Sequence, residues 1–259
     1  MKQNHFVIGY AVNKRKEVEV IYNMIESKIN ENSIIVEPFC GTSAFSYYIY
    51  TKNKDKNLKY ILNDNCKNIY ELYNICKDNN KLTELYNKLI EIHKETTNKP
   101  DYLKVCKKAR EGDLTSWIYI NKIYSIRAGL YPIGKIFTEK SFDSFKKAPI
   151  IDFLQNANIT ISNIDGLDIY EEYKNNEKAI IFIDPPYIQS CNTFYNSPKG
   201  NIYEYLYFND IDKEKAIILL CLENIWIIQL LFKDKKSITY NKTYELSKKK
   251  TEHIFIYKI

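Results

Sequence analysis

Glycine and proline are scarce in this chain, since each accounts for only seven of its 259 residues. That shortage argues against a loop-rich scaffold. The hydrophobic share of 45% and the charged share of 27% are ordinary for a globular protein, and they exclude a disordered chain or a fibrous repeat. At ~150 residues per domain, the length indicates one large domain or a core that carries a substantial insertion.

Metal-ligating side chains are few and dispersed. The three histidines lie far apart in the chain, and none of the six cysteines belongs to a Cys-x-x-Cys pair. Zinc sites need ligands at short spacings, so we expect no metal site. The first residues lack the apolar segment of a signal peptide. We therefore expect reduced thiols and a cytoplasmic protein, either of a bacterium or of the host cell of a phage or virus.

Long apolar runs are also missing. The longest candidate, 216–232, is interrupted by Glu223 and Asn224, and each half is too short to cross a bilayer. We therefore expect no membrane partner, and we predict a buried helix that ends near Leu222 and then a buried strand over Ile225–Phe232. The net charge of +6 is a mild basic bias that permits an anionic partner without identifying one.

Short apolar runs alternate with helical patterns at both ends of the chain. Strands are predicted for four runs: 34–36, 60–62, 179–183 and 254–257. A helix over 42–50, capped by Thr42 or Ser43, follows the first of them. Strands separated by helical segments indicate a doubly wound α/β sheet. The middle of the chain, 66–147, has few strand-like runs and many basic and aromatic residues, which predicts an inserted, mostly helical domain.

The rarest local pattern is Asp184-Pro185-Pro186-Tyr187, which directly follows the apolar run 179–183. In open α/β sheets, ligands bind beyond the carboxyl ends of the strands. The two prolines fix the backbone and remove two N–H donors, which leaves carbonyl oxygens, a carboxylate and an aromatic ring. Such a set accepts hydrogen bonds from an amino group and stacks on a flat ring.

This tetrapeptide resembles the DPPY motif of the Dam-like, S-adenosylmethionine-dependent DNA adenine-N6 methyltransferases. Other segments resemble that family's motifs in the same order: Tyr10–Lys14, Val36–Gly41, Ile61–Asp64, Asn163–Asp165 and Lys250–Glu252. The resemblance implies an α/β, Rossmann-like S-adenosylmethionine-dependent methyltransferase core, made of 1–65 and 150–259. It also implies an inserted, mostly helical target-recognition domain over 66–149. The sequence departs from the family at Val12, where glycine is usual, and at Thr42–Ala44, where a second glycine often follows.

The resemblance further implies an activity. A flipped-out adenine in double-stranded DNA would receive a methyl group on its N6 amine directly from S-adenosylmethionine. The implied catalytic residues are Asp184, Pro185, Pro186 and Tyr187, with Asp184 and the Pro185 carbonyl as acceptors of hydrogen bonds and Tyr187 as the stacking platform. The implied cofactor-binding residues are Tyr10, Lys14, Glu37, Pro38, Phe39, Gly41, Asp64, Asp165 and Asp184. The implied DNA-binding residues are Arg127 and Lys135.

Two other functions are compatible with these residues. Related sites methylate adenines in RNA or side chains in proteins. The glycine-poor first motif and Val12 also leave open a catalytically decayed homologue that only binds DNA. The sequence does not reveal the recognition site, the oligomeric state or whether a cognate restriction endonuclease is a partner.

Overall fold

The computed structural model describes residues 6–7, 17–123, 145–188, 202–243 and 250–259. It divides into two compact units, one formed by Lys16–Lys67 and Asn158–Ile259, the other by Met1–Arg15 and Asn68–Ala157. The first unit contains the whole β-sheet and is called the sheet unit below. The second contains most of α3 and the helices α4, α5, α6 and α8, and is called the helical unit.

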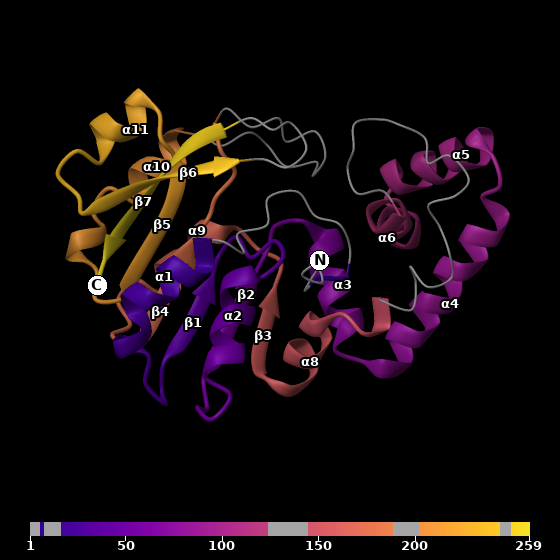
Figure 1. Ribbon diagram of the computed structural model, residues 1–259, viewed down its shortest axis with the longest axis horizontal. Coiled ribbons are helices and arrows are strands. Elements are labelled where there is room, and N and C mark those ends of the chain that lie inside the picture. The colour runs from indigo at the N-terminus through magenta and orange to yellow at the C-terminus, as the bar shows by residue number, and fades with distance from the viewer. Residues whose placement is uncertain (1–5, 8–16, 124–144, 189–201, 244–249) are drawn as a thin grey trace. The chain divides into compact units, whose positions relative to one another are not determined.

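The sheet unit is built on a seven-stranded sheet in the order β3-β2-β1-β4-β5-β7-β6 (Figure 1). The strands are β1 (Ile34–Glu37), β2 (Lys59–Asn63), β3 (Asn158–Ser162), β4 (Ala179–Ile183), β5 (Ile217–Glu223), β6 (Ser237–Thr243) and β7 (Lys250–Lys258). Strands β1 to β5 pair in parallel, and β7 runs antiparallel between β5 and β6. Four of the five predicted strands are confirmed, as β1, β2, β4 and β7.

Helices cover both faces of this sheet (Figure 1). The helices α9 (Gly166–Tyr173), α10 (Ile202–Tyr207) and α11 (Trp226–Leu231) contribute to one core cluster with alternate residues of the strands. The helices α1 (Glu17–Ile25) and α2 (Ala44–Lys52) lie on the other face. There the ring of Phe45 stacks on that of Phe182, with the two ring centroids 4.6 Å apart. Single 3-10 turns span Glu26–Lys28 and Ile211–Lys213. The arrangement confirms the predicted doubly wound, Rossmann-like α/β fold.

The apolar stretch 216–232 folds in the opposite way from our prediction. Its first half is strand β5 and its second half is helix α11. Six of the seven residues of β5 are buried, as expected for a central strand that is covered on both faces. Helix α11 lies at the surface, with Trp226 73% and Leu230 57% exposed. The periodicity of a short apolar run does not distinguish a helix from a strand. Here the half that is buried on both faces became strand β5, and the half at the surface became helix α11.

Five helices lie in the described residues of the helical unit. They are α3 (Lys67–Cys76), α4 (Asn79–Glu95), α5 (Lys99–Arg110), α6 (Leu114–Ile123) and α8 (Pro149–Asn156), and α6 packs against α4 and α5. Helix α4 buries Leu82, Leu85 and Leu89, which recur at helical spacing on one face. No helix among the described residues is long and apolar enough to cross a membrane.

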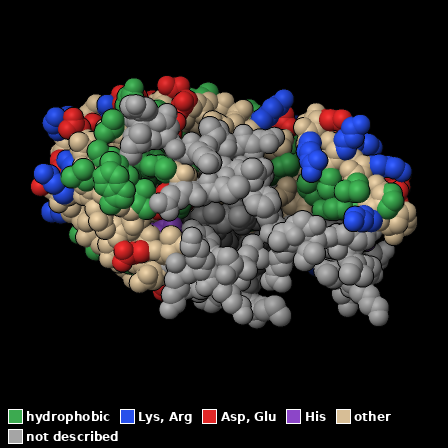
Figure 2. Space-filling model, turned by 90° about the horizontal axis from the view of Figure 1, so that it is seen from above, with side chains coloured by type: hydrophobic (Ala, Val, Ile, Leu, Met, Phe, Trp, Pro, Cys, Tyr) green, Lys and Arg blue, Asp and Glu red, His purple; other side chains and the backbone are tan. Residues whose placement is uncertain are grey.

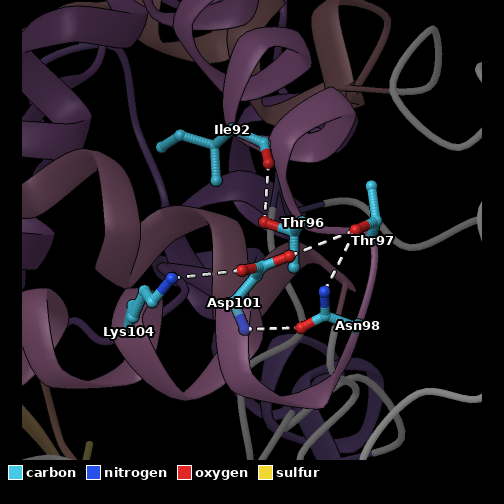
Figure 3. Close-up of polar contacts among 6 residues, drawn as sticks. All are labelled: Ile92, Thr96, Thr97, Asn98, Asp101 and Lys104. Atoms are coloured by element: carbon cyan, nitrogen blue, oxygen red, sulfur yellow. Dashed lines mark hydrogen bonds and ion pairs between the residues drawn. The ribbon is translucent and has the colours of Figure 1, made fainter.

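Helix α5 begins at a well-defined cap (Figure 3). The side chain of Asn98 accepts a hydrogen bond from the backbone N–H of Asp101 at 3.0 Å, and Pro100 occupies the first turn, where no N–H is needed. Thr97 donates to the Asp101 carboxylate at 3.1 Å, and Lys104 contacts the same carboxylate at 3.3 Å. The cap sets where α5 starts.

Candidate active site

The sheet has a topological switch point between β1 and β4. The chain passes from β1 through β2 to β3 at one edge and then returns to place β4 on the other side of β1. In such sheets the connections leave the two central strands in opposite directions, and a ligand site opens beyond their carboxyl ends. The first-motif loop follows β1 at this point, and the Asp184–Tyr187 segment follows β4. The sheet thus brings together two motifs that are far apart in the sequence.

Three neighbouring strands carry an acidic residue at this edge. Glu37 is the last residue of β1, Asp64 follows β2 and Asp184 follows β4. Burial is the main cause that raises the pKa of Glu37, and charge repulsion from the nearby Asp184 and Asp64 adds to it. Carboxyl groups at this edge, where they are ionised, favour a ligand that carries positive charge.

Glu37 is almost fully buried and is 2% exposed. Its Oε1 accepts a hydrogen bond of 2.8 Å from the backbone N–H of Ser46, in the first turn of α2. Ser43 occupies the N-cap position, one of the two predicted, but its side chain makes no capping bond and its φ is 47°. Glu37 on β1 supplies the missing acceptor instead. Burial raises the pKa of Glu37 to about 8, and the bond from Ser46 opposes this rise.

Asp64 joins two loops. Its Oδ2 accepts a hydrogen bond from the N–H of Gly41, and its Oδ1 accepts one from the N–H of Cys66, both at 2.8 Å. Burial raises the pKa of Asp64, while these two backbone bonds lower it. Gly41 has a φ of 48°, a left-handed conformation that glycine adopts without strain. Asp64 therefore holds the turn of the first motif in place.

Asn63 is the residue at this edge that our sequence reasoning did not include among the site residues. It is fully buried. Its Nδ2 donates to the carbonyls of Pro38 at 2.9 Å and Ile164 at 3.0 Å. Its Oδ1 accepts from the hydroxyl of Ser162 at 2.8 Å and from the N–H of Ile164 at 3.1 Å. This amide uses all four of its hydrogen-bonding positions to join the loops that follow β1 and β3. The available signal in the sequence was an Asn between the apolar run 60–62 and Asp64.

The ring of Phe39 packs at the start of helix α9. A Cβ added to Gly166 would lie 2.6 Å from the Phe39 ring and 3.0 Å from the Pro38 carbonyl, so the first-motif loop leaves room only for glycine there. Asp165 is the N-cap of α9, and its Oδ1 accepts from the N–H of Leu167 at 2.9 Å. The structure thus brings Phe39 and Asp165 to neighbouring positions, with one oxygen of Asp165 engaged in the helix cap.

The Asp184–Tyr187 segment directly follows the fully buried strand β4 and belongs to no helix or strand. The hydroxyl of Tyr187 donates to Asp184 Oδ1 at 2.8 Å. The hydroxyl of Tyr205, on α10, donates to the Pro186 carbonyl at 2.7 Å. Tyr187 is 7% exposed, so its ring is enclosed by the protein. Burial, and then the nearby Asp184 carboxylate, raise the pKa of Tyr187 well above its ordinary value of 10.0, so the hydroxyl keeps its proton.

Several predicted site residues lie outside the described residues. These are Tyr10, Lys14, Arg127 and Lys135. Among the residues that the structure describes, no three His, Cys, Asp or Glu side chains are grouped to hold a metal ion. Within the same residues, no disulfide joins any two of Cys40, Cys66, Cys76, Cys106 and Cys221.

Comparison with known proteins identifies the family of the chain. The family model of the D12 class N6 adenine-specific DNA methyltransferases matches residues 10–216, most of the length of the chain. The chain belongs to this family. The match confirms the resemblance that the DPPY and first-motif segments carry, and it makes the protein a DNA adenine-N6 methyltransferase. A comparison with curated proteins finds no match.

Solved structures similar to this D12-class methyltransferase include two of the rRNA methyltransferase aviRa from Streptomyces viridochromogenes. They are 9% and 8% identical to it, with TM-scores of 0.40 and 0.38, and each alignment covers 96% of this chain and 86% of the other. Both TM-scores are low, so these similarities say nothing about the substrate. Membership of the D12 class itself implies a methyl-donor cofactor of the S-adenosylmethionine type.

Proposed function

We propose that this D12-class enzyme transfers a methyl group from S-adenosylmethionine to the N6 amine of an adenine flipped out of double-stranded DNA. The observation that carries the proposal is the position of Asp184-Pro185-Pro186-Tyr187. This segment follows β4 at the switch point of the sheet, beside the first-motif loop that follows β1. That position is the expected place for a ligand in a doubly wound sheet.

The chemistry of the edge fits a cationic cofactor. S-adenosylmethionine has a positively charged sulfonium and an ammonium group, and when bound it supplies an electrophilic methyl group. Three acidic residues stand at this edge, and the turn at Gly41 lets the backbone approach a ligand closely. We assign the cofactor to Glu37–Gly41 with Asp64, Asp165 and Asp184, and, among residues outside the described part, to Tyr10 and Lys14.

The groups of the protein that face the acceptor amine are hydrogen-bond acceptors. The lone pair of the adenine N6 is conjugated with the ring, which makes this nitrogen a weak nucleophile. Acceptance of its two hydrogens by the Asp184 carboxylate and the Pro185 carbonyl favours a tetrahedral nitrogen with its lone pair aimed at the methyl group. No protein nucleophile is needed, and the contribution of the site is close approach and alignment.

The helical unit is our candidate for target recognition. Helix α5 carries five basic side chains and one acidic side chain. Lys104, Lys107, Lys108 and Arg110 are exposed, and Figure 2 shows Lys and Arg side chains at the surface of this unit. Such a face provides charge for contact with DNA phosphates. We propose the segment 66–149 as the recognition insertion, with Arg127 and Lys135 in its DNA-contacting part, and the cytoplasm as the place of the reaction.

The experiment that tests this function is transfer of a tritiated methyl group from S-adenosylmethionine to DNA that lacks N6-methyladenine, to RNA and to protein. We expect transfer to DNA alone, with the label recovered as N6-methyladenine. Asp184→Ala should abolish transfer, while Asp210→Ala, at an exposed aspartate of the same unit, should leave it unchanged. Transfer to RNA or protein instead of DNA would overturn the proposal, as would full activity of Asp184→Ala.

A further inference from the structure

The ring of Tyr187 lies against His253, a residue to which the family motifs give no role. The centroids of the two rings are 5.3 Å apart, and their planes are tilted by 56°. His253 is fully buried. It belongs to β7, which lies beyond β5, on the side of β4 that faces away from β1 (Figure 1). A strand that carries none of the acidic residues of the candidate site therefore contacts its aromatic ring.

His253 is held in place by the strands on both sides of β7. Glu223 on β5 and Tyr240 on β6 are its directly opposite residues in the two antiparallel pairs. Such side chains share one face of the sheet and contact each other. The ring of Tyr240 stacks on His253, with the centroids 5.4 Å apart and the planes 22° apart. The Tyr240 hydroxyl in turn lies 3.0 Å from the sulfur of Cys221 on β5. The position of the imidazole is therefore fixed by three strands.

His253 is also a polar exception in its strand. The three residues that follow it, Ile254, Phe255 and Ile256, are all buried and apolar. Burial of a polar ring costs more free energy than burial of an aliphatic side chain, so packing of the core alone favours an aliphatic residue at this position. What distinguishes position 253 from the rest of β7 is its ring contact with Tyr187.

Together these contacts hold Tyr187 at two points. Its hydroxyl donates to Asp184 Oδ1 at 2.8 Å, and its ring lies against His253. A hydrogen bond at the hydroxyl alone would leave the ring free to swing about that end. The second contact restricts this movement and sets the plane of the ring. A base that stacks on a ring of fixed orientation presents its amine in one direction, as in-line transfer requires.

We propose that His253 is a positioning residue, which supports the ring of Tyr187 as the surface on which the flipped adenine stacks. This inference rests on the proposed function and on the stacking role that the family resemblance implies for Tyr187. His253 acts through Tyr187 and does not itself touch the base. Loss of this support lowers the rate of transfer. It leaves cofactor binding unchanged, because the cofactor is assigned chiefly to the loops that follow β1 and β2.

The test measures single-turnover transfer of a tritiated methyl group to DNA that lacks N6-methyladenine, at saturating S-adenosylmethionine. For His253→Leu we expect the rate to fall about 10-fold, with the Kd for S-adenosylmethionine within about twofold of the wild type in calorimetry. His253→Phe keeps a ring and should stay within about threefold of the wild-type rate. The matched control is Phe255→Leu, which removes a buried ring from the same face of β7, two residues further along the strand. It should keep the wild-type rate.

A double-mutant cycle shows whether His253 acts through Tyr187. When Tyr187 is already replaced by alanine, His253→Leu should cause no further loss of rate, because the ring that it supports is gone. A tritium assay run over hours measures these slow variants.

Four results would overturn the proposal. They are a wild-type rate for His253→Leu, a loss that adds in full to that of Tyr187→Ala, a His253→Phe variant as slow as His253→Leu, and an equal loss in Phe255→Leu. The last would mean that any change in the packing of β7 slows the enzyme. A wild type that methylates only RNA would refute the proposed function instead, and the same cycle on RNA then decides whether His253 supports Tyr187.

Discussion

A glutamate that is buried with a high pKa makes the stability of this enzyme depend on pH in a predictable direction. The pKa of Glu37 rises from its ordinary value of 4.5 to about 8, chiefly because the folded chain removes the carboxyl group from water. Between these two pH values the unfolded chain has released the proton and the folded chain still holds it. The folded state binds more protons than the unfolded state, so stability falls as pH rises through this window.

The size of the effect follows from the two pKa values. They are about 3.5 pH units apart, and each unit corresponds to 1.36 kcal/mol. Ionisation of the other groups is nearly the same in a variant that differs only at Glu37. The free energy of unfolding of Glu37→Gln, minus that of the wild type, should therefore increase by about 5 kcal/mol from pH 4.5 to pH 8 and then level off.

The assay is urea unfolding, followed by circular dichroism, at several pH values from 4.5 to 9. Glu19→Gln, at an exposed position of α1 in the same unit, is the control. Its difference from the wild type should vary little with pH. A difference for Glu37→Gln that stays flat, or that shrinks as pH rises, would refute the buried protonated state. Binding of S-adenosylmethionine near pH 7 should release protons from the wild type but fewer from Glu37→Gln, because the cation favours the ionised glutamate.

Three further changes test the edge of the sheet and the helical unit. Asn63→Asp should weaken binding of S-adenosylmethionine about 10-fold in calorimetry, because it places an acceptor opposite two carbonyls. Asn53→Asp, at the buried C-cap residue that follows α2, should lower stability in thermal unfolding and leave that binding unchanged. Gly166→Ala should lower the free energy of unfolding by about 1–3 kcal/mol in urea, since the new Cβ displaces the Phe39 ring; unchanged stability would contradict that packing. Lys108→Ala should weaken DNA binding and reduce the salt dependence of log K by about one, and an unchanged slope would remove α5 from the interface.

Two local signals in the sequence sufficed to predict the core of the fold. Continuous apolar runs are typical of parallel strands that are covered on both faces, and 34–36 and 179–183 are such strands. The tetrapeptide after the second run gave the family, since a carboxylate followed by two prolines and an aromatic ring is a rare combination. Both features depend on consecutive residues, so they can be recognised from the sequence without any knowledge of the tertiary structure.

The sequence pattern did not predict the secondary structure of the edge strands or of the segment 216–232. Strand β3 buries one of its five residues, so no apolar run marks it. Strand β6 mixes polar and apolar residues at the edge of the sheet. In 216–232 the two halves are equally apolar, and only their positions in the sheet and at the surface decided which became β5 and which became α11.

The same distinction between local sequence and tertiary packing applies to the candidate site. By itself the sequence determined which residue types stand after β1, β2 and β4, because the motifs consist of neighbours along the chain. Only the tertiary structure decided what each side chain contacts: Glu37 caps α2, Asn63 joins two loops, and Tyr187 donates to Asp184. These contacts join residues through the strand order and the packing of buried groups, and neither is encoded in the spacing of a motif.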